Sequence, residues 1–229
     1  MAEKDNDEKI DVFTEQFSKT EHFILNNKNQ ISTVVGVILV IVIGYVAYHK
    51  LVVAPKELEA QTQLFPSEQL FDKDSLLTKA INGDSAAPGF KAVAEKYGST
   101  ASGNLANFYL GASYLRTGKF EEALAALKKY DRSDPILGPI ALGDMGDACL
   151  ELGKKQEAVD YYLKAAKAEK NKFTTPLYLM KAGTAYEEDG KFDKAAEVYE
   201  QVQKEYFETP EGKDAAKFIA RAKAATEKK

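Results

Sequence analysis

Cysteine and histidine are scarce in this sequence, and their scarcity excludes several kinds of catalytic and metal site. Cys149 is the single cysteine, so no disulfide can form within the chain, and we expect this residue to fill a packed helix position. The two histidines, His22 and His49, lie on either side of an apolar run, outside the part expected to fold into a domain. A Ser-His-Asp or Cys-His arrangement inside that domain is therefore excluded, and no paired spacing indicates zinc.

Patterns that bind phosphate, calcium or nucleic acid are also missing. No glycine-rich loop ends in Gly-Lys-Ser/Thr, and residues 131–134 lack the ligand spacing of a calcium loop and are followed by Pro135, which favours a turn. The formal net charge of −4 argues against nucleic acid as the main partner. We expect no enzyme activity, no cofactor, no metal and no small-molecule substrate. A hydrolase built from carboxylates alone stays open, because acidic residues are numerous.

Residues 31–48 form the longest apolar run, with eighteen consecutive uncharged residues rich in valine and isoleucine. As a helix this run would extend roughly 27 Å, close to the hydrocarbon thickness of a bilayer. Tyr45 and Tyr48 lie near one end, where aromatic rings favour the membrane interface. A cleaved signal peptide is the alternative, but the preceding thirty residues are acidic rather than short and basic. We therefore expect residues 31–54 to be a retained transmembrane anchor.

The orientation of this anchor is not decided by charge, because two lysines lie within twenty residues on each side of it. Our hypothesis places residues 1–30 in the cytoplasm as a tail and the large C-terminal domain on the opposite side. Within the tail, apolar residues at helical spacing between residues 10 and 26 suggest a short amphipathic helix. A frayed extension next to the membrane is the other interpretation.

Three copies of one spaced pattern occupy the second half of the chain. Corresponding residues lie 35 apart between the first two copies and 37 apart between the last two. The copies consist of Asn107, Leu110, Gly111, Tyr114, Gly118, Ala123 and Leu127; of Leu142, Met145, Gly146, Cys149, Gly153, Ala158 and Tyr162; and of Leu179, Ala182, Gly183, Tyr186, Gly190, Ala195 and Tyr199. The pattern resembles the tetratricopeptide repeat, a helix–turn–helix unit with a period close to 34 residues.

Each position of the pattern has a physical reason. The glycine of the first helix and the alanine of the second are small, so that two helices can cross closely while larger neighbours fill the space beside the crossing. The glycine between the helices suits a left-handed cap. We therefore predict an all-α solenoid with three repeats in residues 101–208.

The segments on either side of the repeats are expected to cover the ends of the array. Residues 55–100 are interpreted as a degenerate repeat, in which Pro66 would kink or split a first helix that buries Leu58, Leu64, Phe65 and Phe71. Residues 209–229 are interpreted as a capping helix and tail that start at Thr209-Pro210. The packing stripe of this helix would be Ala215, Ala216, Phe218, Ile219 and Ala222.

In tetratricopeptide arrays the first helices of successive repeats line a concave groove, and the resemblance implies a protein-binding groove here. One end would be apolar with a cation and the other mainly acidic, which suits a segment with apolar anchors and some positive charge. Ordinary solvated helix faces are the alternative. Proteins of this family that clamp an acidic chaperone tail use asparagine at positions where this chain has Ala112, Asp147 and Thr184. This difference argues against an acidic tail as the partner. The groove candidates are Leu105, Phe108, Ala112, Arg116, Asp144, Asp147, Leu150, Glu151, Met180, Lys181, Thr184, Glu187 and Glu188.

The combination of short tail, single span and repeat domain resembles the YfgM-like proteins of bacterial inner membranes, especially those of the Bacteroidetes lineage. The resemblance extends over the whole chain and includes Ala54-Pro55-Lys56 and residues 102–106. It implies an ancillary subunit of the SecYEG translocon that works in protein export with a periplasmic chaperone or with exported chains. Two alternatives remain: a structural scaffold of another envelope assembly, for secretion or division, and a cytosol-facing chaperone receptor.

Overall fold

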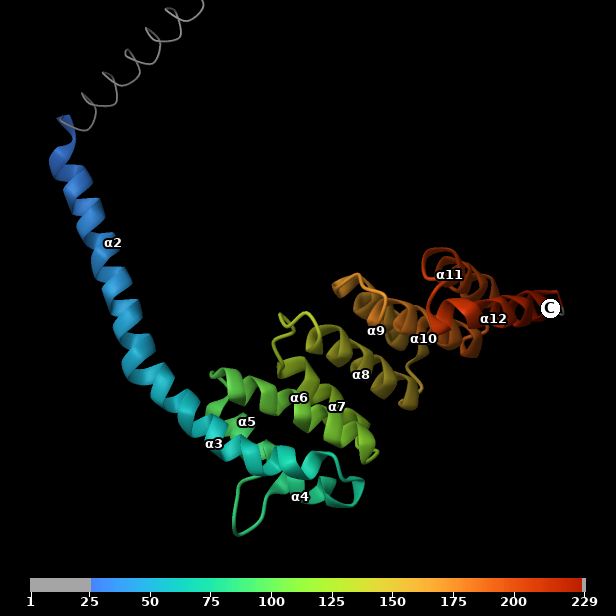
Figure 1. Cartoon of the computed structure of the whole chain (residues 1–229), viewed down its shortest axis with the longest axis horizontal. Helices are drawn as coiled ribbons and strands as arrows, with labels where there is room; N and C mark the ends of the chain where they lie inside the picture. Colours follow the sequence, from blue (N-terminus) through green and yellow to red (C-terminus); the bar gives the residue numbers. More distant parts are fainter. Residues whose placement is uncertain (1–25, 228–229) are drawn as a thin grey trace, which may run out of the picture. The chain divides into compact units, whose positions relative to one another are not determined.

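The computed structural model describes residues 26–227, and the chain divides into two compact units between Pro55 and Lys56 (Figure 1). The amphipathic helix expected between residues 10 and 26 lies almost entirely outside the described residues.

The described residues of the first unit form one helical segment with no protein core. Helix α2 (Lys28–Tyr48) is followed by a π-helical turn, η1 (His49–Val53), and neither buries a residue. In the described part of the chain, one helix is long and apolar enough to cross a membrane, with a mean hydropathy of 2.4 over its most apolar window. Its exposed side chains are mostly valine and isoleucine, which gain nothing from contact with water.

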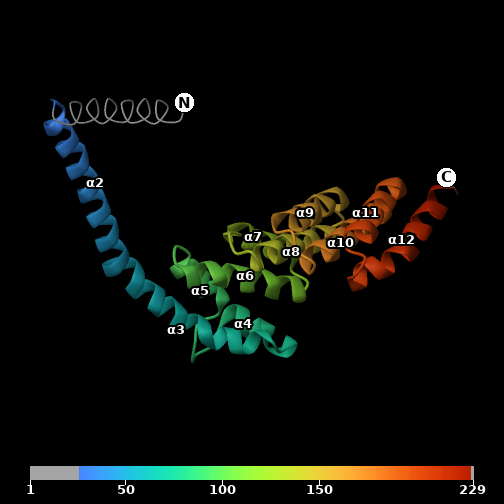
Figure 2. The ribbon, with the colours of Figure 1, turned by 45° about the horizontal axis from the view of Figure 1, so that its top comes forward.

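Among its described residues, the regular secondary structure of the second unit is helical apart from one isolated bridge between Gly83 and Pro88. Its helices follow one another as packed neighbours, which Figures 1 and 2 show as successive antiparallel pairs. The elements are α3 (Ala54–Phe71), the 3-10 turn η2 (Asp74–Leu76), α4 (Leu77–Asn82), α5 (Phe90–Tyr97), α6 (Ala101–Arg116), α7 (Phe120–Lys129), α8 (Leu137–Glu151), α9 (Lys155–Ala168), α10 (Thr174–Glu188), α11 (Phe192–Glu205) and α12 (Pro210–Thr226).

Helix α3 continues through Pro66 to Phe71, so of the two effects expected of this proline, a kink or a split, the split is wrong. Proline removes one helical hydrogen bond, but buried contacts hold the helix on both sides of it. Leu64 is buried, and the Ser67 hydroxyl donates a hydrogen bond of 2.9 Å to the Pro88 carbonyl. The expected burial of Leu58 and Phe65 is also wrong, because both side chains are exposed.

The close helix crossings predicted from glycine and alanine are confirmed. A Cβ atom at Gly146 would lie 2.5 Å from Cε1 of Tyr162, and one at Gly183 would lie 2.2 Å from Cε1 of Tyr199. Ala158, in the second helix of the same pair, is fully buried. The rings of the second helix therefore rest directly on the backbone of the first, where no side chain could fit.

The left-handed caps after the first helices are also confirmed. Gly118, Gly153 and Gly190 have φ angles of 73°, 71° and 71°, a region that glycine enters without steric cost. The next backbone N–H in each case donates back to the first helix, as Lys154 does to the Cys149 carbonyl at 2.8 Å. Cys149 itself is fully buried, as expected for a packed helix residue.

The beginning of α12 also agrees with the sequence. The Thr209 hydroxyl accepts a hydrogen bond from the Gly212 N–H at 3.1 Å, and Pro210 is the first helical residue. Ala215, Ile219 and Ala222 are buried, whereas Ala216 is exposed and does not belong to the packing stripe.

The crossing at Gly146 provides a test of this packing. Gly146→Val would improve helix propensity but force two methyl groups against the buried Tyr162 ring, and we expect it to lower the free energy of unfolding by about 1–3 kcal/mol. Urea unfolding followed by far-ultraviolet circular dichroism measures the change. The control, Ala216→Val, alters an exposed helix position and should change stability by about 0.5 kcal/mol. Unfolding curves for Gly146→Val that coincide with those of the unmodified protein would contradict the crossing.

Candidate protein-binding groove

A hollow of about 260 Å³ lies between α8 and α10, the first helices of the second and third repeats, and the C-terminal helix α12. We call it the α8–α10 hollow. Its lining comes from α8, α9, α10 and α12, so it depends on the stacking of successive pairs. It brings together five of the thirteen groove candidates with three further residues: Asp147, Leu150, Met180, Lys181 and Thr184, then Tyr162, Leu177 and Phe218.

One wall of the hollow carries a hydrogen-bonded ion pair. The Lys181 ammonium lies 2.7 Å from each carboxylate oxygen of Asp147, and the Tyr162 hydroxyl donates to the same carboxylate at 2.6 Å. The Lys181 ammonium also lies 5.7 Å from the centre of the Tyr162 ring, within reach of a cation–π attraction. Burial and the neighbouring Asp147 carboxylate raise the pKa of Tyr162, so its hydroxyl stays protonated and continues to donate. The negative charge of Asp147 is therefore already balanced by Lys181.

The rest of the lining is mostly apolar. Leu150, Met180 and Phe218 are partly buried, and Leu177 is 39% exposed. Thr184 adds a hydroxyl that donates to the Met180 carbonyl at 3.2 Å. Such a surface can hold an apolar side chain, with polar groups at its edge that restrict how the side chain enters.

Asp144, one helical turn before Asp147 on α8, is partly buried and makes no hydrogen bond or ion pair with any described residue. Burial raises its pKa to about 7, the nearby Asp147 carboxylate acts in the same direction, and Lys181 acts in the opposite one. The Tyr178 side chain lies on the facing helix, and burial, followed by the charge of Asp144, raises the pKa of Tyr178. Asp144 is thus a costly carboxylate in this fold, since no hydrogen bond or ion pair replaces its lost hydration.

The remaining acidic candidates differ in how far they are committed to the fold. Glu187 forms an ion pair with Arg221 of α12, with Nε of Arg221 3.1 Å from Oε1. Glu151 and Glu188 are exposed. At the acidic end of the groove expected from sequence, Glu151 and Glu188 are therefore exposed, whereas Glu187 is bound to the C-terminal helix.

The candidates of the first pair do not form an open surface. Phe108 and Ala112 are buried in the core, and Leu105 is partly buried between two core clusters. Arg116 is held by the N-terminal helices: it pairs with Asp74, donates to the Phe71 carbonyl at 2.8 Å and lies over the Phe71 ring. This cation serves packing against α3 and η2.

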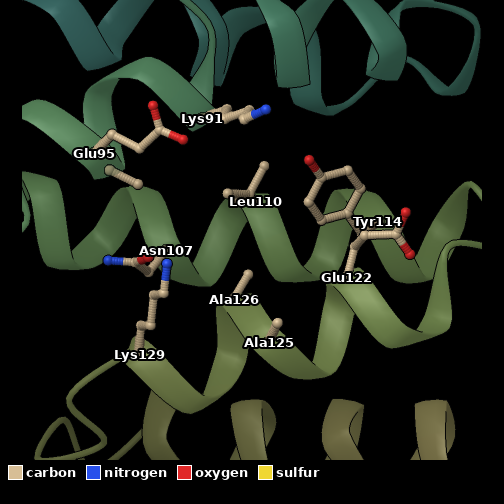
Figure 3. Close-up of a pocket in the computed structure, with 10 residues that line it drawn as sticks. Lys91, Glu95, Asn107, Leu110, Tyr114, Glu122, Ala125, Ala126 and Lys129 are labelled. Atoms are coloured by element: carbon tan, nitrogen blue, oxygen red, sulfur yellow. The ribbon is translucent and has the colours of Figure 1, made fainter.

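A second hollow, of about 270 Å³, lies on the opposite face of α6, between α5 and α7 (Figure 3). Lys91 and Glu95 come from α5, Leu110 and Tyr114 from α6, and Glu122 and Lys129 from α7. Opposite charges are mixed around it and its floor is small and apolar. None of the thirteen groove candidates lines this second hollow.

Sequence reasoning missed three residues of the α8–α10 hollow, for different reasons. Leu177 lies one helical turn before Met180 and Lys181, so helical spacing alone would have included it. Tyr162 was assigned only to the helix crossing, although its hydroxyl reaches Asp147. Phe218 was placed in the packing stripe of α12, and nothing in the sequence indicates that it closes a hollow formed by α8 and α10.

Comparisons with known proteins agree with this architecture. Sequence profiles described as tetratricopeptide repeat match residues 81–135, 140–172 and 178–206, which together cover just over half of the 229 residues. The fold is similar to a crystal structure of a kinesin light chain with nearly identical TPR-like repeats from Podosopora anserina, with a TM-score of 0.58 and 16% identity over 75% of this chain and 88% of that chain. A single-residue variant of that protein gives a TM-score of 0.52 and 17% identity over 79% and 89%. No curated protein matches the sequence.

The unpartnered carboxylate predicts a pH dependence of stability. Because the pKa of Asp144 is raised from 3.8 to about 7 by folding, the folded protein takes up a proton in this interval and loses stability as pH rises through it. Asp144→Asn should therefore be more stable than the unmodified protein at pH 8 by up to about 4 kcal/mol, with the difference vanishing near pH 4. Urea unfolding at several pH values measures it. Glu188→Gln, an exposed control, should show no such trend; a constant difference for Asp144→Asn would refute the explanation.

Proposed function

Because this chain belongs to the tetratricopeptide-repeat family, we propose that it is a membrane-anchored scaffold that binds a segment of a partner protein in the α8–α10 hollow. The observation that carries this proposal is the combination of an apolar hollow with an adjacent unpartnered carboxylate. The fold needs neither of them, since Asp144 destabilises it and Leu177 is left in water. Binding alone would suffice for such a function, without nucleotide or metal.

The chemistry of the hollow defines the partner segment. An apolar side chain would contact Leu150, Leu177 and Met180, and Phe218 would cover it. A lysine or arginine nearby would meet Asp144, because Asp147 is already bound by Lys181. The exposed carboxylates of the same helices add negative potential, which favours a segment with positive charge.

The size of the hollow also favours a protein segment over a small molecule. Small-molecule pockets usually have volumes of about 300–1,000 Å³ and enclose most of their ligand. This hollow of about 260 Å³ has room for one or two side chains. Affinity would come from such an anchor together with contacts along the neighbouring helices.

We propose that α2 spans a bilayer. The supporting observations are its length, its mean hydropathy and the absence of buried residues along it. Attachment to a membrane would restrict the repeat unit to a thin layer and raise its effective concentration near any membrane complex.

The similarity to YfgM-like proteins supports a more specific proposal, in which the chain is an ancillary subunit of the Sec translocon. The repeat unit would then lie in the periplasm of a bacterial inner membrane and bind exported chains or a periplasmic chaperone. Newly exported segments carry both apolar anchors and basic residues, which is the chemistry that the hollow would accept.

Site-specific crosslinking in intact membranes tests the groove. With a photoreactive amino acid at Leu177, we expect crosslinks to translocon subunits and to many exported chains. With the same group at Glu157, exposed on α9, we expect few. One fixed partner captured at Leu177 would favour a structural scaffold of another assembly. Equal capture at both positions would contradict a role for the hollow.

Fractionation and a topology fusion test the anchor. The full chain should remain in the membrane pellet after carbonate extraction, since an apolar helix that spans the bilayer is not released by breaking electrostatic contacts. Alkaline phosphatase fused after Lys229 should be active, as it is outside the cytoplasm. Recovery of the full chain in the soluble fraction would disprove the anchor. If the phosphatase fusion is inactive and a fluorescent protein fused at the same position is fluorescent, the repeats lie in the cytosol and a chaperone receptor there is favoured.

A further inference from the structure

The exposed apolar side chains of the helix-pair array are gathered at one of its edges. In the described residues from α6 onward, the large hydrophobic side chains that are exposed are Ile136, Phe173, Leu177 and Phe207. Ile136, Phe173 and Phe207 lie in the loops that precede α8, α10 and α12, and their exposed fractions are 65%, 87% and 64%. Leu177 lies one helical turn after Phe173.

These loops share one edge, because each antiparallel pair is followed by the next in the same sense (Figure 1). We call it the entry edge and define it by residues 130–136, 169–173 and 206–209 together with the start of α6. The opposite edge, formed by the glycine-capped loops at residues 117–119, 152–154 and 189–191, has no exposed large hydrophobic side chain among its described residues. Isolated exposed hydrophobic residues are common on proteins, but this distribution is one-sided.

The two central loops are held in fixed conformations. The Asp134 carboxylate accepts hydrogen bonds from the backbone N–H groups of Ile136 and Leu137, at 2.8 and 2.7 Å. The Asn171 side-chain oxygen accepts the equivalent pair from Phe173 and Thr174, each at 2.7 Å. Ile136 and Phe173 therefore occupy equivalent positions, and the caps that satisfy the backbone leave their side chains in solvent.

Lysines are frequent around the most exposed of these side chains, although Lys172 pairs with Glu208 of the same edge at 2.6 Å. Residues 164–173 contain four lysines and one glutamate, and the last turns of α7, α9 and α11 also carry lysine. Lysine next to exposed aromatic and aliphatic tips is the composition of surfaces that rest on anionic lipid headgroups.

The chain enters the repeat unit at this same edge. The Glu57 carboxylate accepts a hydrogen bond of 3.1 Å from the backbone N–H of Ser102, in the first turn of α6. Glu59 pairs with Lys96, in the last turn of α5, at 3.0 Å. Lys56, the first residue of the unit, is therefore only one residue away from a contact with the entry edge, and Leu58 beside it is also exposed.

We propose that the entry edge lies on the surface of the bilayer, with Ile136, Phe173 and Phe207 inserted among anionic headgroups. The inference rests on the proposed membrane anchor, because the tether brings this edge to the lipid. It also explains why the apolar tips are at the edge where the chain enters and absent from the opposite one.

The sequence contains no tryptophan, so one introduced residue reports on its own environment. The full chain with Phe173→Trp is reconstituted in vesicles of phosphatidylethanolamine and phosphatidylglycerol, in which a fraction of the lipid is brominated high on the acyl chain. We expect blue-shifted emission and at least roughly twofold quenching, because the ring lies at the interface. Replacing phosphatidylglycerol by phosphatidylcholine, or adding salt, should reduce the quenching, since the lysines act electrostatically.

The matched control is Phe192→Trp, at the start of α11 on the opposite edge, which should not be quenched. Flotation of the vesicles separates the two proposals. If both variants float and only Phe173→Trp is quenched, the entry edge contacts lipid. If both float and Phe173→Trp remains unquenched, or the two variants are quenched equally, this proposal fails and the anchor stands. If the protein does not float, the anchor fails and the proposal fails with it.

Discussion

The contact between a helix backbone and an aromatic ring of the next helix is the constraint on which the other features of the array depend. Tyr162 lies against Gly146, and Tyr199 lies against Gly183, with no space for even one added methyl group. This contact fixes how far each pair can close and where the ring hydroxyl ends. The Tyr162 hydroxyl ends on Asp147, which in turn holds Lys181 of the following pair. A packing requirement within one pair thus determines the charge arrangement between two pairs.

The two ends of the array are covered in different ways, and this leaves the open surface near the C-terminal end. At the N-terminal end, α3 and η2 bind Arg116 through Asp74 and the Phe71 carbonyl, which closes the first pair. At the other end, α12 packs against α10 and α11 but leaves a hollow between its Phe218 and the side chains of α8 and α10. The candidate site is therefore a property of stacked pairs, and no single repeat contains it.

The sequence was a good guide wherever one residue type satisfies a strict local requirement. Glycine at positive φ and glycine or alanine at a crossing have few substitutes, so their spacing predicted the helix pairs. Prediction failed where distant contacts compete with a local preference, as at Pro66, where burial of Leu64 and the Ser67 hydrogen bond keep α3 intact. The sequence also could not distinguish Asp144 from Asp147, because Lys181, the residue that binds Asp147, lies 34 residues away in the chain. Phe218 is a similar case, since its role depends on how α12 docks.

Because α12 lines the hollow, the number of helices in the array affects which partner segments the protein can bind. Phe218 and Arg221 are supplied by an element outside the three repeats, at the position where a further pair would begin. Lengthening or shortening the array at this point would exchange one wall of the site while leaving the earlier pairs intact. New selectivity can therefore arise in such a chain by gain or loss of a terminal helix, with no substitution in α8 or α10.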